Sequence, residues 1–169
     1  MSYQIHFRPP PAEVLQGLRR FLARVLQAVA KEMDFQNELA VSHIIEKKLS
    51  APGPETLGVR TGRLRRSIRR TKAIITGSAV ESSIGSNVEY AGIHEYGGQT
   101  RPHIIRARNG KALAFAVGGK MLFRRSVKHP GSKIKARGYI RKSLEERSAG
   151  YGEALGRAVV RAWRERGGR

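Results

Sequence analysis

The sequence lacks cysteine altogether, which excludes a disulfide framework and every metal site built on thiolates. No apolar run approaches the roughly 20 residues that a membrane-spanning helix needs. Residues 1–11 also lack the apolar segment of a secretory signal. Aromatic residues make up 7% of the chain, too few for a surface on which the bases of a single strand would stack. Because a long apolar run and a signal segment are both missing, we expect no membrane partner.

Acidic residues are scarce as well: 13 Asp and Glu accompany 33 Lys and Arg, for a formal net charge of +20. The excess is uneven, because residues 1–99 hold 14 basic and 9 acidic residues, whereas residues 100–169 hold 19 and 4. A field of this sign attracts polyanions such as nucleic acid, anionic lipid or an acidic protein surface. The alternative interpretation is a solvated surface that only keeps the protein in solution.

The length of 169 residues predicts one domain over the whole chain. Residues 1–11 are expected to form an extended leader that ends in three prolines. The region 12–49 is expected to be helical, because apolar residues recur at steps of three and four from Val14 to Val29. A change of phase around Met33 predicts a second helix, N-capped by Asp34.

The stretch 59–98 organises the rest of the chain. It follows a loop at 50–58 and opens with a cationic amphipathic turn at 61–70, in which Leu64 and Ile68 share one helical face. A helix this short is marginal alone, so the apolar pair must dock on a larger body.

Two strands are predicted within the same stretch, at 72–77 and 80–85, joined near Gly77. Three of their residues are expected to share a buried face: Ile75, Val80 and Ile84. The stretch then closes at Tyr90–Gly98 on an aromatic, acidic hairpin or turn, in which we expect both tyrosine rings to be buried.

Further strands are predicted at 103–107 and 111–117, on either side of Arg108-Asn109-Gly110. Asn-Gly is the strongest short signal for a hairpin, so these two strands are expected to pair with each other. Gly118-Gly119 then returns the chain into 120–124. The region 59–127 is thus expected to be an antiparallel sheet with one short basic helix.

A turn at 129–131 and a basic loop at 132–138 lead to a helical region at 138–166, and residues 167–169 are expected to be frayed. The predicted apolar stripe of this region, interrupted at 148–152, consists of Tyr139, Ile140, Leu144, Leu155, Val159 and Trp163. The predicted fold class is α+β, with N-terminal helices and a C-terminal helix packed on an antiparallel sheet with long loops.

Catalytic motifs are incomplete in this sequence. His94-Glu95 begins like a zinc-protease helix, but Gly98 stands where the second histidine of that motif belongs. Gly58–Arg63 is shorter than a phosphate-binding loop and has no lysine partner. Glu89, His94 and Glu95 form a conceivable acid/base set, yet such residues at a tight turn more often make local hydrogen bonds or subunit contacts. We expect no enzyme, no metal and no cofactor.

Four short strings carry a resemblance to a known family. They are Val59–Ile68, Ile84–Ala91, Ile93–Gly97 and Ala136–Ile140, the last of which precedes the C-terminal helix. In this order and spacing they resemble the tail-completion and head–tail joining proteins of tailed bacteriophages, also described as virion morphogenesis proteins. The pattern departs from that family at Gly138, where family members often have proline. With glycine there, the start of the C-terminal helix is expected to be less rigid.

The resemblance implies an α+β virion protein that is made in the host cytoplasm and forms rings, commonly hexameric, at the head–tail junction or proximal tail. The implied partners are portal-side adaptor or stopper proteins, tail terminator or tail tube proteins, and double-stranded DNA contacted without sequence preference. A free-standing nucleic-acid-binding module is the alternative.

Two groups of site residues follow from these expectations. The first forms a structural or oligomer-contacting turn, in which Gly97 or Gly98 takes a positive φ: Tyr90, His94, Glu95, Tyr96 and Gly97. The second contacts a polyanion or an acidic partner protein: Arg63, Arg65, Arg66, Arg124, Arg125, Lys133, Lys135 and Arg137.

Overall fold

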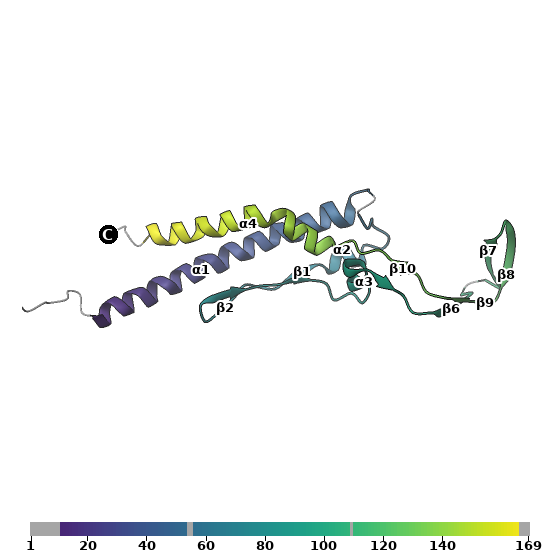
Figure 1. The fold of residues 1–169 in the computed structure, drawn as a ribbon, viewed down its shortest axis with the longest axis horizontal. Helices are drawn as coiled ribbons and strands as arrows, with labels where there is room; N and C mark the ends of the chain where they lie inside the picture. The colour runs from purple at the N-terminus through teal and green to yellow at the C-terminus, as the bar shows by residue number, and fades with distance from the viewer. Residues whose placement is uncertain (1–10, 54–55, 109, 166–169) are drawn as a thin grey trace, which may run out of the picture. The chain divides into compact units, whose positions relative to one another are not determined.

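The computed structural model describes residues 11–53, 56–108 and 110–165 (Figure 1). The chain divides into two compact units, one formed by residues 1–88 and 139–169 and the other by residues 89–138. We call them the helical unit and the ribbon unit. The predicted leader, apart from Pro11, and the predicted frayed tail lie outside the described residues. Within the described part of the chain, no helix is both long and apolar enough to cross a membrane.

The helical unit begins with one continuous helix, α1 (Pro11–His43), which runs into a π-helix, η1 (Ile44–Ser50). Pro11 starts the helix as its missing N–H favours. The predicted break with an Asp34 N-cap is wrong. The Asp34 carboxylate accepts hydrogen bonds from Arg70 Nη1 at 2.8 Å and from the Ala73 N–H at 2.9 Å. Asp34 therefore holds a distant segment against α1 instead of capping a helix.

The C-terminal helix α4 (Tyr139–Arg164) lies antiparallel beside α1 (Figure 1). Its predicted interruption at 148–152 is wrong, because Gly150 and Gly152 lie within a continuous helix. The predicted apolar stripe is also wrong in part, since Leu144, Val159 and Trp163 are exposed. The residues of α4 that are buried are mostly small: Tyr139, Ser143, Ala154, Ala158 and Ala162. Small side chains allow two helix backbones to approach closely, whereas the larger residues need more room.

The core of the helical unit lies where α1, η1 and the start of α4 meet α2 (Arg63–Ser67). Its buried members are Val41, Ile44, Leu49, Ile68 and Tyr139, with Leu64 and Ile84 among the residues packed against them. The prediction that Leu64 and Ile68 dock on a larger body is confirmed. The helix itself ends at Ser67, because Ile68 is already extended, at φ −65° and ψ 123°.

Four short strands complete the helical unit. β1 (Arg69–Arg70) pairs with β4 (Ile84–Gly85), and β2 (Ile74–Thr76) pairs with β3 (Ala79–Glu81), both antiparallel. The hairpin predicted around Gly77 is confirmed. The predicted burial of Ile75 is wrong, because that side chain is 43% exposed. A two-stranded hairpin covered on one side by a single helix has no second layer to bury it.

The ribbon unit starts with a short helix, α3 (Ala91–Tyr96), where a hairpin or turn was expected. Six strands follow: β5 (Gly98–Gln99), β6 (His103–Arg106), β7 (Leu113–Val117), β8 (Lys120–Arg124), β9 (Ser126–His129) and β10 (Lys133–Ile134). They pair in nested antiparallel order, β5 with β10, β6 with β9 and β7 with β8. The chain thus runs out along one side of a ribbon and returns along the other.

The hairpin predicted at Asn109-Gly110 is wrong, since β6 pairs with β9 and not with β7. Asn109 itself lies outside the described residues. The turn that closes the ribbon is Gly118-Gly119, where φ is 55° and 77°. A positive φ at both central residues is the requirement of a type I′ hairpin, which two glycines meet without strain. The α+β class with antiparallel pairing is confirmed, but the strands form two-stranded ladders and not one sheet.

Candidate functional site

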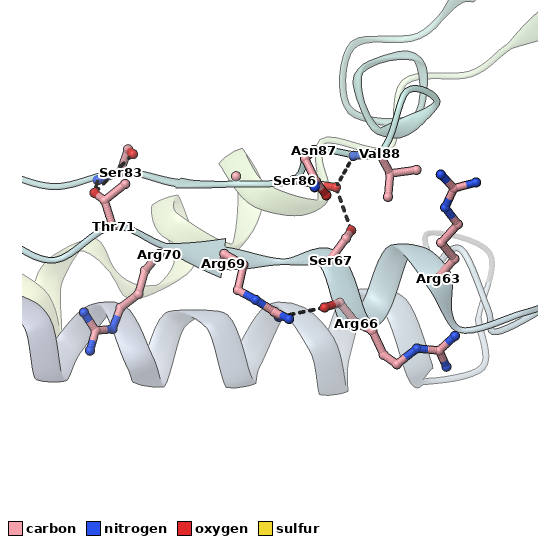
Figure 2. Close-up of a pocket in the computed structure, with 11 residues that line it drawn as sticks. Arg63, Arg66, Ser67, Arg69, Arg70, Thr71, Ser83, Ser86, Asn87 and Val88 are labelled. Carbon is pink, nitrogen blue, oxygen red and sulfur yellow. Dashed lines mark hydrogen bonds between the residues drawn. The ribbon is translucent and has the colours of Figure 1, made fainter.

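An open groove of about 620 Å³ lies in the helical unit, lined by α2, β1, β4 and the segment that follows β4 (Figure 2). Four arginines line it: Arg63, Arg66, Arg69 and Arg70. Gly62 starts α2 in the left-handed region, at φ 69°. A Cβ at Gly62 would lie 2.8 Å from Arg66 Nη1, so the glycine leaves room for that guanidinium. The local backbone therefore places a cluster of cations beside one another.

Arg70 is the one of these four arginines that pairs with carboxylates of the described residues. Arg70 Nη1 lies 2.8 Å from Asp34 Oδ1, and Arg70 Nε lies 2.7 Å from Glu38 Oε2. The hydrogen bond with Glu38 raises the pKa of Arg70, which keeps it charged. Its charge is balanced locally, and its role in the groove is to tie β1 to α1.

The other three arginines make hydrogen bonds with carbonyl oxygens or have no carboxylate partner within the described part of the chain. Arg69 Nη1 donates to the carbonyl oxygens of Arg66 at 2.6 Å and Ile68 at 3.1 Å. Arg66 Nη2 donates to the carbonyl oxygen of Thr61 at 3.2 Å. Among the described residues, no acidic side chain pairs with Arg63, Arg66 or Arg69. Carbonyl partners orient a guanidinium without neutralising it, so the net charge of the groove is positive.

Hydroxyl groups connect the two sides of the groove. Ser67 Oγ and Ser86 Oγ are 2.7 Å apart, and the Val88 N–H donates to Ser86 Oγ at 3.1 Å (Figure 2). On the strands, the Ser83 N–H donates to Thr71 Oγ1 at 2.8 Å. Ser67 Oγ also donates to the Leu64 carbonyl oxygen at 2.7 Å, so Ser86 Oγ donates to Ser67 Oγ and the two hydroxyl protons are used within the protein. Guanidinium groups are the usual donors to phosphate and carboxylate oxygens. The arrangement of the arginines is therefore suited to holding an extended anion.

The predicted basic residues divide between the two units. Arg63 and Arg66 line the groove, but Arg65 does not, because its Nη1 donates to Ser50 Oγ at 3.4 Å. The remaining predicted residues lie in the ribbon unit: Arg124, Arg125, Lys133, Lys135 and Arg137. All of these are exposed except Arg137, which is half-buried and donates its backbone N–H to the His94 carbonyl oxygen at 2.8 Å.

Sequence reasoning missed Arg69 and Arg70 as groove residues, together with the hydroxyl groups of Ser67 and Ser86. The basic run 63–70 is visible in the sequence, but its partner segment is not. β1 meets β4 through the register Arg69↔Gly85, which brings together residues sixteen apart in the chain. A search for serines opposite an arginine-rich strand would have found the groove only once this pairing was known.

The predicted structural turn, 90–97, is the helix α3 with its flanking residues. The rings of Tyr90 and His94 are in edge contact, with centroids 5.9 Å apart. The expected burial of both tyrosines is wrong: Tyr90 is 37% and Tyr96 80% exposed, because they flank and end a helix of less than two turns. Glu95 is buried. Burial lowers the pKa of His94, and the positive charge of Arg137 lowers it further.

Two glycines follow the C-terminal end of this helix. Gly97 has φ 75° and Gly98 has φ 147°, as predicted. A Cβ at Gly97 would lie 2.8 Å from the Ala136 nitrogen, so only glycine fits. Gly138 has φ 59° and donates its N–H to the Glu95 carbonyl oxygen at 3.1 Å. Proline can do neither, which gives a physical reason for glycine at this position.

No group of three or more His, Asp or Glu side chains among the described residues is placed to hold a metal ion. The family model described as "Bacteriophage HK97-gp10, putative tail-component" matches residues 12–97, just over half of the chain. The match runs from α1 to the end of α3 and includes the whole groove, but not β5–β10 or α4. No curated protein and no solved structure matches the chain.

Proposed function

Because this chain belongs to the HK97-gp10-like family of bacteriophage tail components, and is thus a structural protein of the phage tail, we propose a specific place for it. It forms an oligomeric ring at the head–tail junction, and this ring is a hexamer, as is common among the tail-completion and head–tail joining proteins that the sequence resembles. There it joins head to tail and surrounds the passage of the DNA. Its neighbours are portal-side adaptor or stopper proteins and tail terminator or tail tube proteins.

The observation that carries this proposal is the groove. Three arginines that have no acidic partner among the described residues line this open groove, which lies inside the segment that matches the family. A ring around DNA must contact phosphates without reading bases, because the sequence that passes it changes continuously. Guanidinium donors on an open surface meet that need. The same groove also favours the second candidate, a sequence-independent nucleic-acid-binding module that acts outside a particle.

Self-association is supported by an exposed apolar face on α1. Leu15, Leu18 and Leu22 recur at helical spacing and are 57%, 49% and 48% exposed. Trp163 of α4 stacks edge-on against Phe21 and is still 60% exposed. Contiguous exposed apolar surface of this kind is typical of subunit interfaces. The exposed ring of Tyr96 supports a contact role for the α3 region in the same way.

The test replaces Arg63, Arg66 and Arg69 together with Gln and follows particles through two steps, head–tail joining and DNA ejection. Arg65→Gln is the matched control, because Arg65 belongs to the same helix but lies outside the groove. Joined particles that fail to eject DNA would support the proposal that the groove lines the DNA passage. Unjoined heads and tails would mean that the groove binds an acidic protein instead. Normal joining and normal ejection would refute any polyanion role for the groove.

A further inference from the structure

The described strands of the ribbon unit enclose no buried core. From residue 98 to residue 137, with residue 109 outside the described part, no described residue is buried. A two-stranded hairpin is at best marginally stable in water, and one normally survives by packing on a third strand or a helix. The ribbon therefore lacks the burial that its own fold would need in isolation.

Both faces of the β7–β8 hairpin carry apolar residues, and one of them also holds Lys120 and Arg124 at its two ends. In the β7–β8 register, Phe115 pairs with Leu122 on one face, while Ala114 pairs with Phe123 and Ala116 with Met121 on the other. Val117 is 56%, Met121 59% and Phe123 61% exposed. A hairpin that lies on the surface of its own protein needs only one apolar face, because the other meets water. Apolar residues on both faces indicate that both faces become covered.

The charge around the hairpin restricts what covers it. Residues 96–138 contain eleven Lys and Arg and no Asp or Glu. Pairing of this hairpin with the same hairpin of a second copy would place like charge beside like charge, because the second ribbon has the same eleven cations and no carboxylate. DNA offers phosphates to the cations but no apolar surface to two opposite hairpin faces. An acidic protein surface with an apolar centre satisfies both requirements.

We propose that the β7–β8 hairpin inserts into a net-acidic neighbouring virion protein, which is not a second copy of this chain. That neighbour covers both apolar faces and pairs with the cations at the base of the hairpin, Arg124 and Arg125. The proposal rests on the place of the chain in the virion given above. The hairpin is a second contact surface, separate from the groove, and its partner is a protein with both apolar and acidic residues.

The first test places a photo-crosslinking amino acid at Phe123, and in a control chain at Ile74, which is 59% exposed in the helical unit. Irradiated particles are digested and the adducts identified by mass spectrometry. A Phe123 adduct with a different virion protein of negative net charge, at least tenfold above any from Ile74, is the expected result. Adducts with a second copy, a basic protein, DNA or lipid, or none above the control, overturn the proposal. If the chain is missing from particles, the proposed function fails first and this inference fails with it.

The second test is the double variant Phe123→Thr with Met121→Thr, because threonine keeps the strand preference while removing the apolar contact. We expect at least a tenfold loss of infectious particles with an unchanged thermal unfolding midpoint of the free chain. Ile74→Thr should leave both quantities unchanged. Full infectivity of the double variant, or a loss matched by unfolding of the free chain, contradicts a docking role.

Discussion

The two units of this protein stabilise their backbones by different means. The helical unit encloses a core in which Ile44, Ile68 and Tyr139 are at most 1% exposed, and ion pairs such as Arg161–Glu32 join its two long helices. The ribbon unit has three nested ladders, and its strands contain no buried residue. We infer that most of the stabilisation on folding comes from burial in the helical unit. The ribbon unit is held by backbone pairing and leaves its side chains exposed to a partner. The difference indicates that the helical unit is the scaffold and the ribbon is a contact element.

Truncating one apolar residue in each unit should have very different effects on stability. Ile44→Ala should cost about 2–5 kcal/mol of unfolding free energy, because it leaves a cavity in a closed core. Phe123→Ala should change it by less than about 0.5 kcal/mol, because that side chain is already in water. Chemical denaturation of the free chain measures both. Similar costs would mean that the hairpin contributes to the fold of the free chain.

A second comparison concerns glycine. Gly97→Val should cost about 1–3 kcal/mol or more, because it forces a branched residue into positive φ against the backbone of Ala136. The neighbouring His94→Ala should be milder, since it removes one ring contact and leaves the backbone intact. Amide exchange of residues 91–96 reports the opening of this segment. Equal exchange rates in the two variants would show that Gly97 is not required there.

The smallest expected effect is a pH dependence of the helical unit. Burial lowers the pKa of His43, and the nearby Glu146 carboxylate opposes this only in part. The folded protein therefore keeps His43 neutral, while the unfolded chain takes up a proton below about pH 6.5. This contribution to stability is present above that pH and is lost as the pH falls below it.

The thermal midpoint should accordingly drop between pH 7 and pH 5.5, and less so in His43→Gln, which keeps a partner for Ser143 Oγ. The hydrogen bond from Lys48 lowers the pKa of Glu146. The stability that Glu146 contributes is therefore lost only in more acidic solution, as the pH falls below about 4.5. A midpoint that is flat from pH 7 to pH 5.5 would exclude a contribution from His43.

The sequence is informative where local rules decide the structure. The Gly77 hairpin, the docking of Leu64 and Ile68 and the positive φ of Gly97 all follow from side chains near in sequence. Errors arose where a distant segment decides. Asp34 has the composition of a cap but binds Arg70, and the interruption predicted at 148–152 does not occur because the packing of α4 on α1 offsets the cost of Gly150 and Gly152.

The ribbon and the groove show the same limit. Asn109-Gly110 is a good local hairpin signal, yet β6 finds its partner beyond β8, through a pairing that closes only after Gly118-Gly119. In the groove, Arg63 and Arg66 were identified from charge alone, whereas the hydroxyl groups across from them depend on the β1–β4 register. Positive charge can be counted in a sequence, but the surface on which it gathers depends on strand pairing.

A high-resolution electron-microscopy map of intact particles would locate this chain in the virion. We expect copies of the chain in a closed ring at the head–tail junction, with Arg63, Arg66 and Arg69 lining the DNA passage. The map should also show the β7–β8 hairpin buried in a different, acidic protein. A map that places the chain outside that junction, or as isolated subunits with the groove turned away from the DNA, would contradict this expectation.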